Sequence, residues 1–239
     1  GLDAILPGVS GDETIKSHGI LALHPEAKRG VLEGNPAYED MVEASNLARI
    51  NFSIELVRVG NSIARVFAGS LNETFRRSVD LLESICKIPI ERKADTLLYS
   101  PGGAPYDLSL SEALIDLGSV TDILSEDGFI ILVAECVMGY GSYDFYDWMR
   151  KFKSSADILR ALRTIFNWGG YAAYRLLSYL ERFNMLLVSA LPDYYAVEIF
   201  GLKSFRAVND ALRYSINVIG KGADVVAIPN GRAVIPVVK

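Results

Sequence analysis

The chain has 239 residues, of which 50% are hydrophobic and 22% are charged, and its formal net charge is -5 at pH 7. This is enough apolar material for one large or two small domains, and it excludes a disordered chain. Basic and acidic residues are interspersed, so no basic face indicates nucleic acid or an anionic membrane as a partner. The longest apolar run, 128–134, is too short to span a membrane. Cys86 and Cys136 lie far apart in apolar surroundings, which is typical of reduced thiols and predicts a cytoplasmic protein.

The first ninety residues predict two helices and a hairpin before a third helix. Acidic residues at its start favour a short helix over Asp12–Ser17. Asn35 followed by Pro36 is typical of an N-cap and the first helical position, which predicts a second helix. Alternating apolar residues predict a β-hairpin, with strands at 52–58 and 62–67 joined by 59–61. A helix is expected over 71–86, after which Pro89 and a polar cluster place a domain boundary within 88–94.

From Asp95 onward, continuous runs of Val, Ile and Leu alternate with helical patterns. Such strands are typical of a parallel sheet covered on both faces, so the predicted fold class is α/β, with a parallel-rich sheet between helices preceded by an α/β segment with a hairpin. The predicted strands are 96–100, 129–135, 185–190 and 223–228. The predicted helices are 109–118, 143–152, 156–166, 170–183, 194–199 and 205–219, with a helical or turn segment ending at 127.

A glycine-rich turn, Ser100–Asp107, joins the first of these strands to the helix at 109. Two adjacent glycines, Gly102 and Gly103, let the backbone approach a ligand or another chain segment closely. The spacing fits neither a dinucleotide fingerprint nor a P-loop. A tight connection without a ligand has the same pattern, and geometry alone favours that interpretation.

Short blocks follow one another in a fixed order over nearly the whole chain. They are Leu6–Val9, His24–Ala27, Gly34–Pro36 with Glu39 and Asp40, Phe67–Gly69, Ala94 and Asp95 with Ser100–Gly103, Ala134–Cys136, Gly169 and Gly170, and Ile228–Gly231. Together, these blocks resemble the nickel-pincer lactate racemase family. The resemblance implies that 1–90 is the C-terminal part of the N-terminal cofactor and metal domain. It also implies that 91–239 is the C-terminal α/β domain, whose last strand could return to the first domain.

The activity that the resemblance implies is that of an isomerase, a racemase or epimerase of 2-hydroxy acids. Its cofactor, a nickel-pincer nucleotide, takes a hydride from the substrate α-carbon and returns it to either face, while histidine bases move the hydroxyl proton. The family's catalytic histidines are expected upstream of Gly1, so this chain is expected to be an incomplete piece that is inactive by itself. The active site is expected in a cleft between the domains.

The same resemblance implies roles for residues on the cofactor side. His18 lies where the nickel-binding histidine is expected, although a histidine near a helix end is commonly a cap or surface residue. Gly102 and Gly103 are expected to bind the cofactor. Asp3 stands in place of the lysine that tethers the cofactor, and an aspartate cannot form that amide-type link.

Two further positions imply a change of substrate. In the family's racemases a glutamine and a lysine face the substrate, whereas this chain has Glu112 and Ile115 there. A carboxylate repels an anionic acid, so lactate is a doubtful substrate. Glu112 is expected to bind hydroxyl groups of a larger polyol-like acid, or else to be a solvated helix residue. Trp168 is expected to close over the ligand, and a core tryptophan is the alternative.

The sequence is also compatible with two other functions. The chain could be a non-catalytic binding or interaction module that keeps the family fold, which Asp3 and Ile115 favour. A phosphate-binding transferase using the strand-to-helix turns is a weaker option. The expected partner is a small 2-hydroxy acid, with neither nucleic acid nor membrane, and a homo-oligomer is left open.

Overall fold

The computed structural model describes residues 1–60 and 62–239. Its contacts divide the chain into two compact units, Gly1–Lys87 and Ile88–Lys239. The functional division at residue 90, with a cofactor domain before it, stays a prediction. No helix among the described residues is long and apolar enough to cross a membrane.

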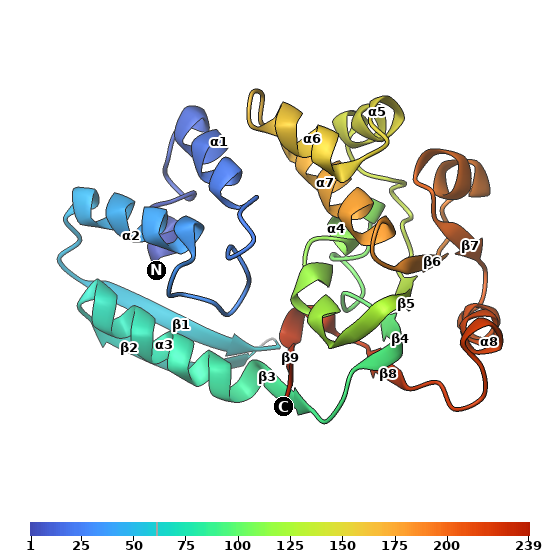
Figure 1. The fold of residues 1–239 in the computed structure, drawn as a ribbon. Coiled ribbons are helices and arrows are strands. Elements are labelled where there is room, and N and C mark those ends of the chain that lie inside the picture. The colour runs from blue at the N-terminus through green and yellow to red at the C-terminus, as the bar shows by residue number, and fades with distance from the viewer. Residues whose placement is uncertain (61) are drawn as a thin grey trace. The chain divides into compact units, whose positions relative to one another are not determined.

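The first unit contains three helices and a β-hairpin in the predicted order (Figure 1). Asn35 caps the second helix, because its side-chain oxygen accepts hydrogen bonds from the backbone N–H groups of Ala37 and Tyr38. The first helix is longer than predicted and continues to Leu21. The elements are η1 (Leu2–Ala4), α1 (Asp12–Leu21), α2 (Pro36–Ala48), β1 (Ser53–Val59), β2 (Ser62–Gly69) and α3 (Leu71–Cys86).

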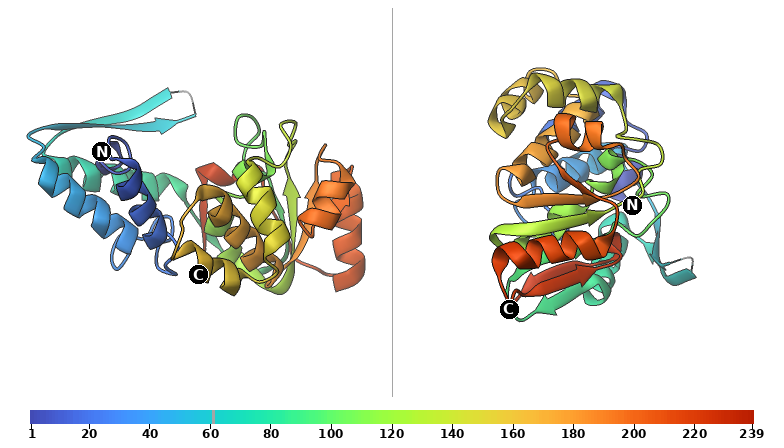
Figure 2. Two further views of the ribbon diagram at one scale, coloured as in Figure 1. Left: turned by 90° about the horizontal axis from the view of Figure 1, so that it is seen from above. Right: turned by 90° about the vertical axis from the view of Figure 1, so that its right-hand side faces the viewer.

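The hairpin prediction is confirmed. Strands β1 and β2 pair antiparallel from Ser53 opposite Gly69 to Val59 opposite Ser62. The predicted turn includes Asn61, which lies outside the described residues. Helix α3 packs along both strands (Figure 2, left), so the hairpin gains the support that an isolated two-stranded ribbon lacks.

The second unit is built on a five-stranded parallel sheet, with the strand order β7-β6-β5-β4-β8. The predicted α/β class with a parallel sheet is thereby confirmed. Its strands are β4 (Ala94–Tyr99), β5 (Leu124–Val133), β6 (Asn184–Val188), β7 (Lys203–Phe205) and β8 (Val225–Ile228). Its helices are α4 (Leu110–Ala113), η2 (Leu117–Ser119), η3 (Thr121–Ile123), α5 (Tyr143–Lys151), α6 (Ser155–Leu162), α7 (Trp168–Leu180), η4 (Tyr194–Ile199), α8 (Val208–Ile219) and η5 (Gly231–Ala233).

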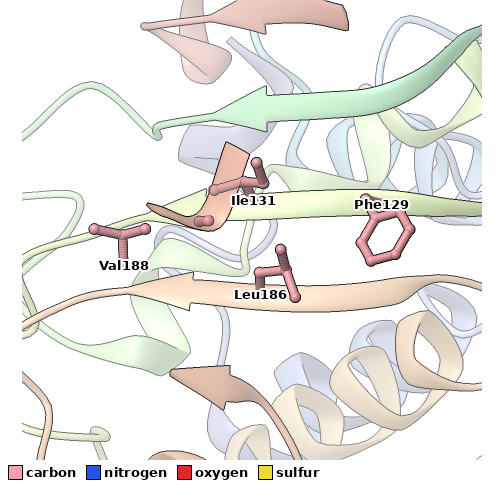
Figure 3. Close-up of a cluster of buried hydrophobic side chains, with 5 residues drawn as sticks. Phe129, Ile131, Leu186 and Val188 are labelled. Atoms are coloured by element: carbon pink, nitrogen blue, oxygen red, sulfur yellow. The ribbon is translucent and has the colours of Figure 1, made fainter. Parts of the chain in front are cut away.

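Helices cover both faces of this sheet. Helix α8 lies across one face (Figure 2, right), where Ala211 packs against Phe129, Ile131, Leu186 and Val188 of the strands (Figure 3). Helices α5, α6 and α7 pack on one another on the other side of the sheet, where α7 contacts β6 (Figure 1). Burial on both faces explains the apolar runs within the central strands β4, β5 and β6.

The predicted helix over 109–118 is wrong beyond its first turn. Only Leu110–Ala113 is α-helical, and the chain continues as the 3-10 segments η2 and η3. The physical reason is a change of period, because Leu114, Leu117, Val120 and Ile123 are spaced by three residues and are all buried. A spacing of three places side chains on one face of a 3-10 helix, whereas an α-helix would turn them progressively away.

The segment of the predicted domain boundary, 88–94, begins with regular structure. Lys87–Ile90 forms strand β3, which pairs with the C-terminal strand β9 (Ile235–Val238) in a two-stranded sheet. Pro89 therefore lies within a strand instead of ending regular structure, and Pro236 lies within its partner. Proline is tolerated there because each of the two strands has a free edge. The short strands β3, β7 and β9 carry too few residues to show a period in the sequence.

The glycine-rich turn packs against the segment that follows β8. The Ser100 N–H donates to the Ile228 carbonyl over 2.9 Å, and the Gly231 N–H donates to the Ser100 carbonyl over 2.9 Å. Gly102 has a φ of +118° and packs on the Asn230 side chain, whose Oδ1 would lie 2.6 Å from a Cβ at Gly102. This contact with Asn230 accounts for a glycine at position 102, and no ligand is needed to explain it. Gly103 also has a positive φ, but open space surrounds it.

Substituting Gly231→Ala is expected to destabilise the protein by about 3 kcal/mol, as overpacking of a dense core does. A Cβ at this position would lie 1.9 Å from the ring of Tyr99, which is fully buried. Urea unfolding followed by circular dichroism measures the change. Gly11→Ala is the matched control, since nothing lies within 4 Å of its Cβ position; equal stability of the two variants would contradict the prediction.

Candidate functional site

His18 is held by a carboxylate within the first unit. It lies in the last turns of α1, and its Nδ1 is 2.8 Å from Oδ2 of Asp40 on α2. The two helices pack together, and only 13% of the His18 side chain is exposed. A carboxylate on one ring nitrogen fixes the tautomer and orients the other nitrogen, Nε2, as a lone-pair donor. The alternative of a surface or capping histidine does not account for this burial.

The position of the expected tethering lysine is exposed. Asp3 lies in η1, and its side chain is 80% exposed. The residue present therefore does not fit a covalent link to a cofactor at this position.

A cavity of about 400 Å³ lies in the second unit beside α4 and the start of α7. It brings together three residues singled out in the sequence, Glu112, Ile115 and Trp168. Its walls are formed by Ser111, Glu112, Leu114, Ile115, Ser142, Trp168, Gly169, Tyr171, Ala172 and Arg175. A mostly apolar cavity of this size with a few polar groups is typical of a small-molecule site.

Glu112 is oriented by the cap of its own helix. The Ser109 hydroxyl donates to Glu112 Oε2 over 3.0 Å, and the Glu112 N–H donates to Ser109 Oγ over 3.4 Å. This arrangement is a variant of the capping box, in which the glutamate helps to satisfy the helix start. Glu112 Oε1 makes no hydrogen bond within the described residues, so it can accept one from a ligand.

Trp168 is placed by the start of α7. Asn167 caps this helix through a 2.6 Å bond from the Gly170 N–H, and Gly169 packs so closely on α5 that a Cβ would lie 2.5 Å from the Phe145 nitrogen. The indole contacts the ring of Phe166, yet the residue is 57% exposed. The alternative of a core tryptophan is therefore wrong.

Arg175 is a cavity residue that the sequence reasoning missed. Its Nε donates to the Tyr179 hydroxyl over 2.8 Å, its Nη1 donates to the Tyr171 hydroxyl over 3.0 Å, and its Nη2 also contacts Tyr179. Burial lowers the pKa of Arg175, but the oxygens of Tyr179 and Tyr171 more than offset this, so the pKa lies above its ordinary value. The available signal was the four-residue spacing of Tyr171, Arg175 and Tyr179 on one helix face.

A second cavity, of about 450 Å³, lies at the carboxyl ends of β4, β5 and β6, where open α/β sheets commonly bind ligands. Asp107 and Arg206 are among its walls, but Gly102 and Gly103 line neither cavity. Cofactor binding by the two glycines stays a prediction.

Cys136 borders this region but is a poor nucleophile. Burial raises the pKa of its thiol to about 11, although Ser189 opposes the change through a hydrogen bond. The thiolate is the reactive form, so little of it exists near neutral pH. The expectation of a buried core thiol agrees with this environment, whereas Cys86 is only partly buried.

Comparison with known proteins identifies relatives along the whole chain. The family model of the lactate racemase C-terminal domain matches residues 90–236. The lactate racemase of Thermoanaerobacterium thermosaccharolyticum is 24% identical over 242 residues, covering 98% of this chain and 57% of that protein. The lactate racemase of Lactiplantibacillus plantarum is 26% identical over 245 residues, with the same coverage of 98% and 57%. The chain thus spans little more than half the length of these curated relatives.

The fold agrees with these relatives. The structure of the lactate racemase apoprotein from Thermoanaerobacterium thermosaccharolyticum superposes with a TM-score of 0.90 at 24% identity, covering 99% of this chain and 58% of that one. A crystal structure of a Thermotoga maritima protein gives a TM-score of 0.64 at 15% identity, with coverage of 100% and 62%. On the match to the C-terminal domain model, which covers more than half of the sequence, the chain belongs to the lactate racemase family.

Proposed function

We propose that the protein is a racemase or epimerase of 2-hydroxy acids that works by hydride transfer with a nickel-pincer nucleotide. Family membership supports this class of reaction. The observation that carries the proposal is the His18–Asp40 pair, a mostly covered imidazole with one nitrogen already bound to a carboxylate. Such carboxylate–histidine pairs are typical of metal ligands.

The residues present fit a nickel centre in which the protein contributes one ligand. Among residues 1–60 and 62–239, no three His, Cys, Asp or Glu side chains gather as a metal site. His18 Nε2 would supply one nitrogen donor, and the remaining donors would come from the cofactor. A square-planar set of soft donors with one imidazole suits nickel.

When bound, such a cofactor supplies the hydride acceptor for the substrate α-carbon. Asp40 would hold the His18 ring in the tautomer that keeps Nε2 unprotonated and available to the metal. Trp168, at the rim of the cavity in the second unit, would exclude water from the bound substrate.

The covalent tether does not fit this chain, because Asp3 replaces the lysine and is exposed. The nucleotide would be held without a covalent bond, by the His18–nickel contact and by polar contacts to its phosphate.

The full-length protein, produced together with the cofactor-synthesis enzymes, tests the proposal. We expect bound nickel, a cofactor absorbance band, and interconversion of the two α-configurations of a 2-hydroxy acid, followed by chiral chromatography. Solvent deuterium should not enter the α-carbon, because a hydride returned by the cofactor does not exchange with water. Absence of both nickel and chromophore would sink the proposal.

The second candidate is a non-catalytic binding module with the same fold. Asp3 and Ile115 favour it, since both differ from the family's functional residues. This candidate predicts ligand binding in the cavity without nickel and without interconversion. The same preparation therefore separates the two functions.

A further inference from the structure

We propose that the cavity beside α4 and α7 binds a hydroxylated carboxylic acid larger than lactate, with Arg175 as the cation for the carboxylate and Glu112 as the acceptor for hydroxyl groups. As a statement about the substrate, this rests on the proposed function. The cavity itself lies wholly within the second unit.

Arg175 carries a charge that the fold does not neutralise. Its side-chain hydrogen bonds end on the hydroxyl groups of Tyr171 and Tyr179, and no carboxylate pairs with it among the described residues. A guanidinium has five N–H donors, and three are used here, so two remain. A buried or half-buried charge without a counterion is costly, which favours a site that receives an anion from outside.

The guanidinium is also held rigidly. The Arg175 Nη2 lies so close to Gly118 that a Cβ there would be 2.2 Å away. The Arg175 Cζ lies 5.8 Å from the centre of the Tyr171 ring and 5.4 Å from the centre of the Tyr179 ring. A fixed planar fork binds a carboxylate with little further loss of side-chain entropy.

Glu112 requires that the ligand also carry hydroxyl groups. Its Oε1 is available and its carboxylate makes no ion pair with Arg175 among the residues described, although both line one cavity. A carboxylate attracts hydroxyl donors and repels a second anion. A ligand that satisfies both side chains therefore carries an acid group at one end and hydroxyl groups further along.

The remaining walls match a carbon chain. Leu114, Ile115 and Ala172 are apolar, and the exposed indole of Trp168 offers a face on which C–H groups pack. A three-carbon acid would leave much of a 400 Å³ cavity unfilled. A longer acid with several hydroxyl groups would fill it.

Titration calorimetry with four probes tests the inference on the full-length protein. The probes are gluconate, its uncharged counterpart glucitol, hexanoate, which lacks hydroxyl groups, and lactate. We expect gluconate to bind at least about 10-fold more tightly than each of the others, because only gluconate engages both charged residues. Glucitol binding as tightly as gluconate, or no binding of gluconate, would overturn the inference.

Two substitutions then locate the cation. Arg175→Gln should weaken gluconate binding about 10- to 100-fold and leave glucitol unchanged, while Arg175→Lys should restore part of the loss. Arg160→Gln is the matched control, since Arg160 is an exposed residue of α6 paired with Asp157. An unchanged gluconate affinity in folded Arg175→Gln would contradict the assignment. If that variant does not fold, calorimetry of the unsubstituted protein with the four probes still tests whether the cavity binds a hydroxylated acid.

Calorimetry also separates this inference from the proposed function, because it requires neither nickel nor turnover. Gluconate binding by a protein without nickel or activity would remove the proposed racemase function and leave the binding site. Interconversion of a 2-hydroxy acid by a protein that does not bind gluconate would keep the proposed function and overturn this inference.

Discussion

The substitution His18→Ala is expected to lower the nickel content of the protein more than about 100-fold and to abolish interconversion of 2-hydroxy acids. His18 is a mostly covered imidazole that Asp40 orients and the proposed metal ligand, and loss of a direct ligand should exceed the 10- to 100-fold that loss of an outer partner costs. Mass spectrometry of bound metal and the cofactor absorbance measure the effect without relying on activity.

His24→Ala is the matched control, because His24 is the only other histidine in the sequence and is exposed. It should keep its nickel. Asp40→Asn should give an intermediate loss of about 10- to 100-fold, because the ring orientation is weakened while the ligand remains. Full nickel content in His18→Ala would show that the metal is held by other residues.

The double substitution Glu112→Gln and Ile115→Lys is expected to tighten lactate binding by about 10- to 100-fold. It removes a carboxylate from the cavity and adds an ammonium group at a residue that is 56% exposed. A hydrogen bond to a charged group contributes about 1.5–3 kcal/mol, which corresponds to that range. Calorimetry with lactate measures the change.

The control Ile115→Glu makes the opposite change at the same exposed position. It should weaken binding of any anionic acid while leaving the thermal unfolding temperature nearly unchanged, as expected for a surface substitution. Equal lactate affinities in the lysine and glutamate variants would mean that residue 115 does not face the bound acid.

Part of the candidate site was predictable from the family resemblance. The resemblance implied that Glu112 faces the substrate and that Trp168, before two adjacent glycines, closes over it, and the structure brings both residues to one cavity. Arg175 was not identified, because its role depends on the enclosure made by Gly118, Tyr171 and Tyr179. An arginine in an amphipathic helix gives no local sign of whether a carboxylate lies nearby.

The glycine-rich turn was also only partly interpretable from the sequence. Its pattern indicated close approach of the backbone to something, and the structure identifies this neighbour as Asn230, about 130 positions further along the chain. Gly231 in turn allows contact with Tyr99. Both contacts arise because β8 pairs with β4, which no local period encodes.

The sequence by itself determined the α/β class, the hairpin, most helices and the apolar strands, because hydrophobic period and capping residues act over a few positions. Only the tertiary structure decided the strand order, the 3-10 segments after α4, the His18–Asp40 pair and the place of Arg175 in the cavity. These depend on contacts between residues far apart in the chain, and such contacts form only when the packed core brings distant segments together.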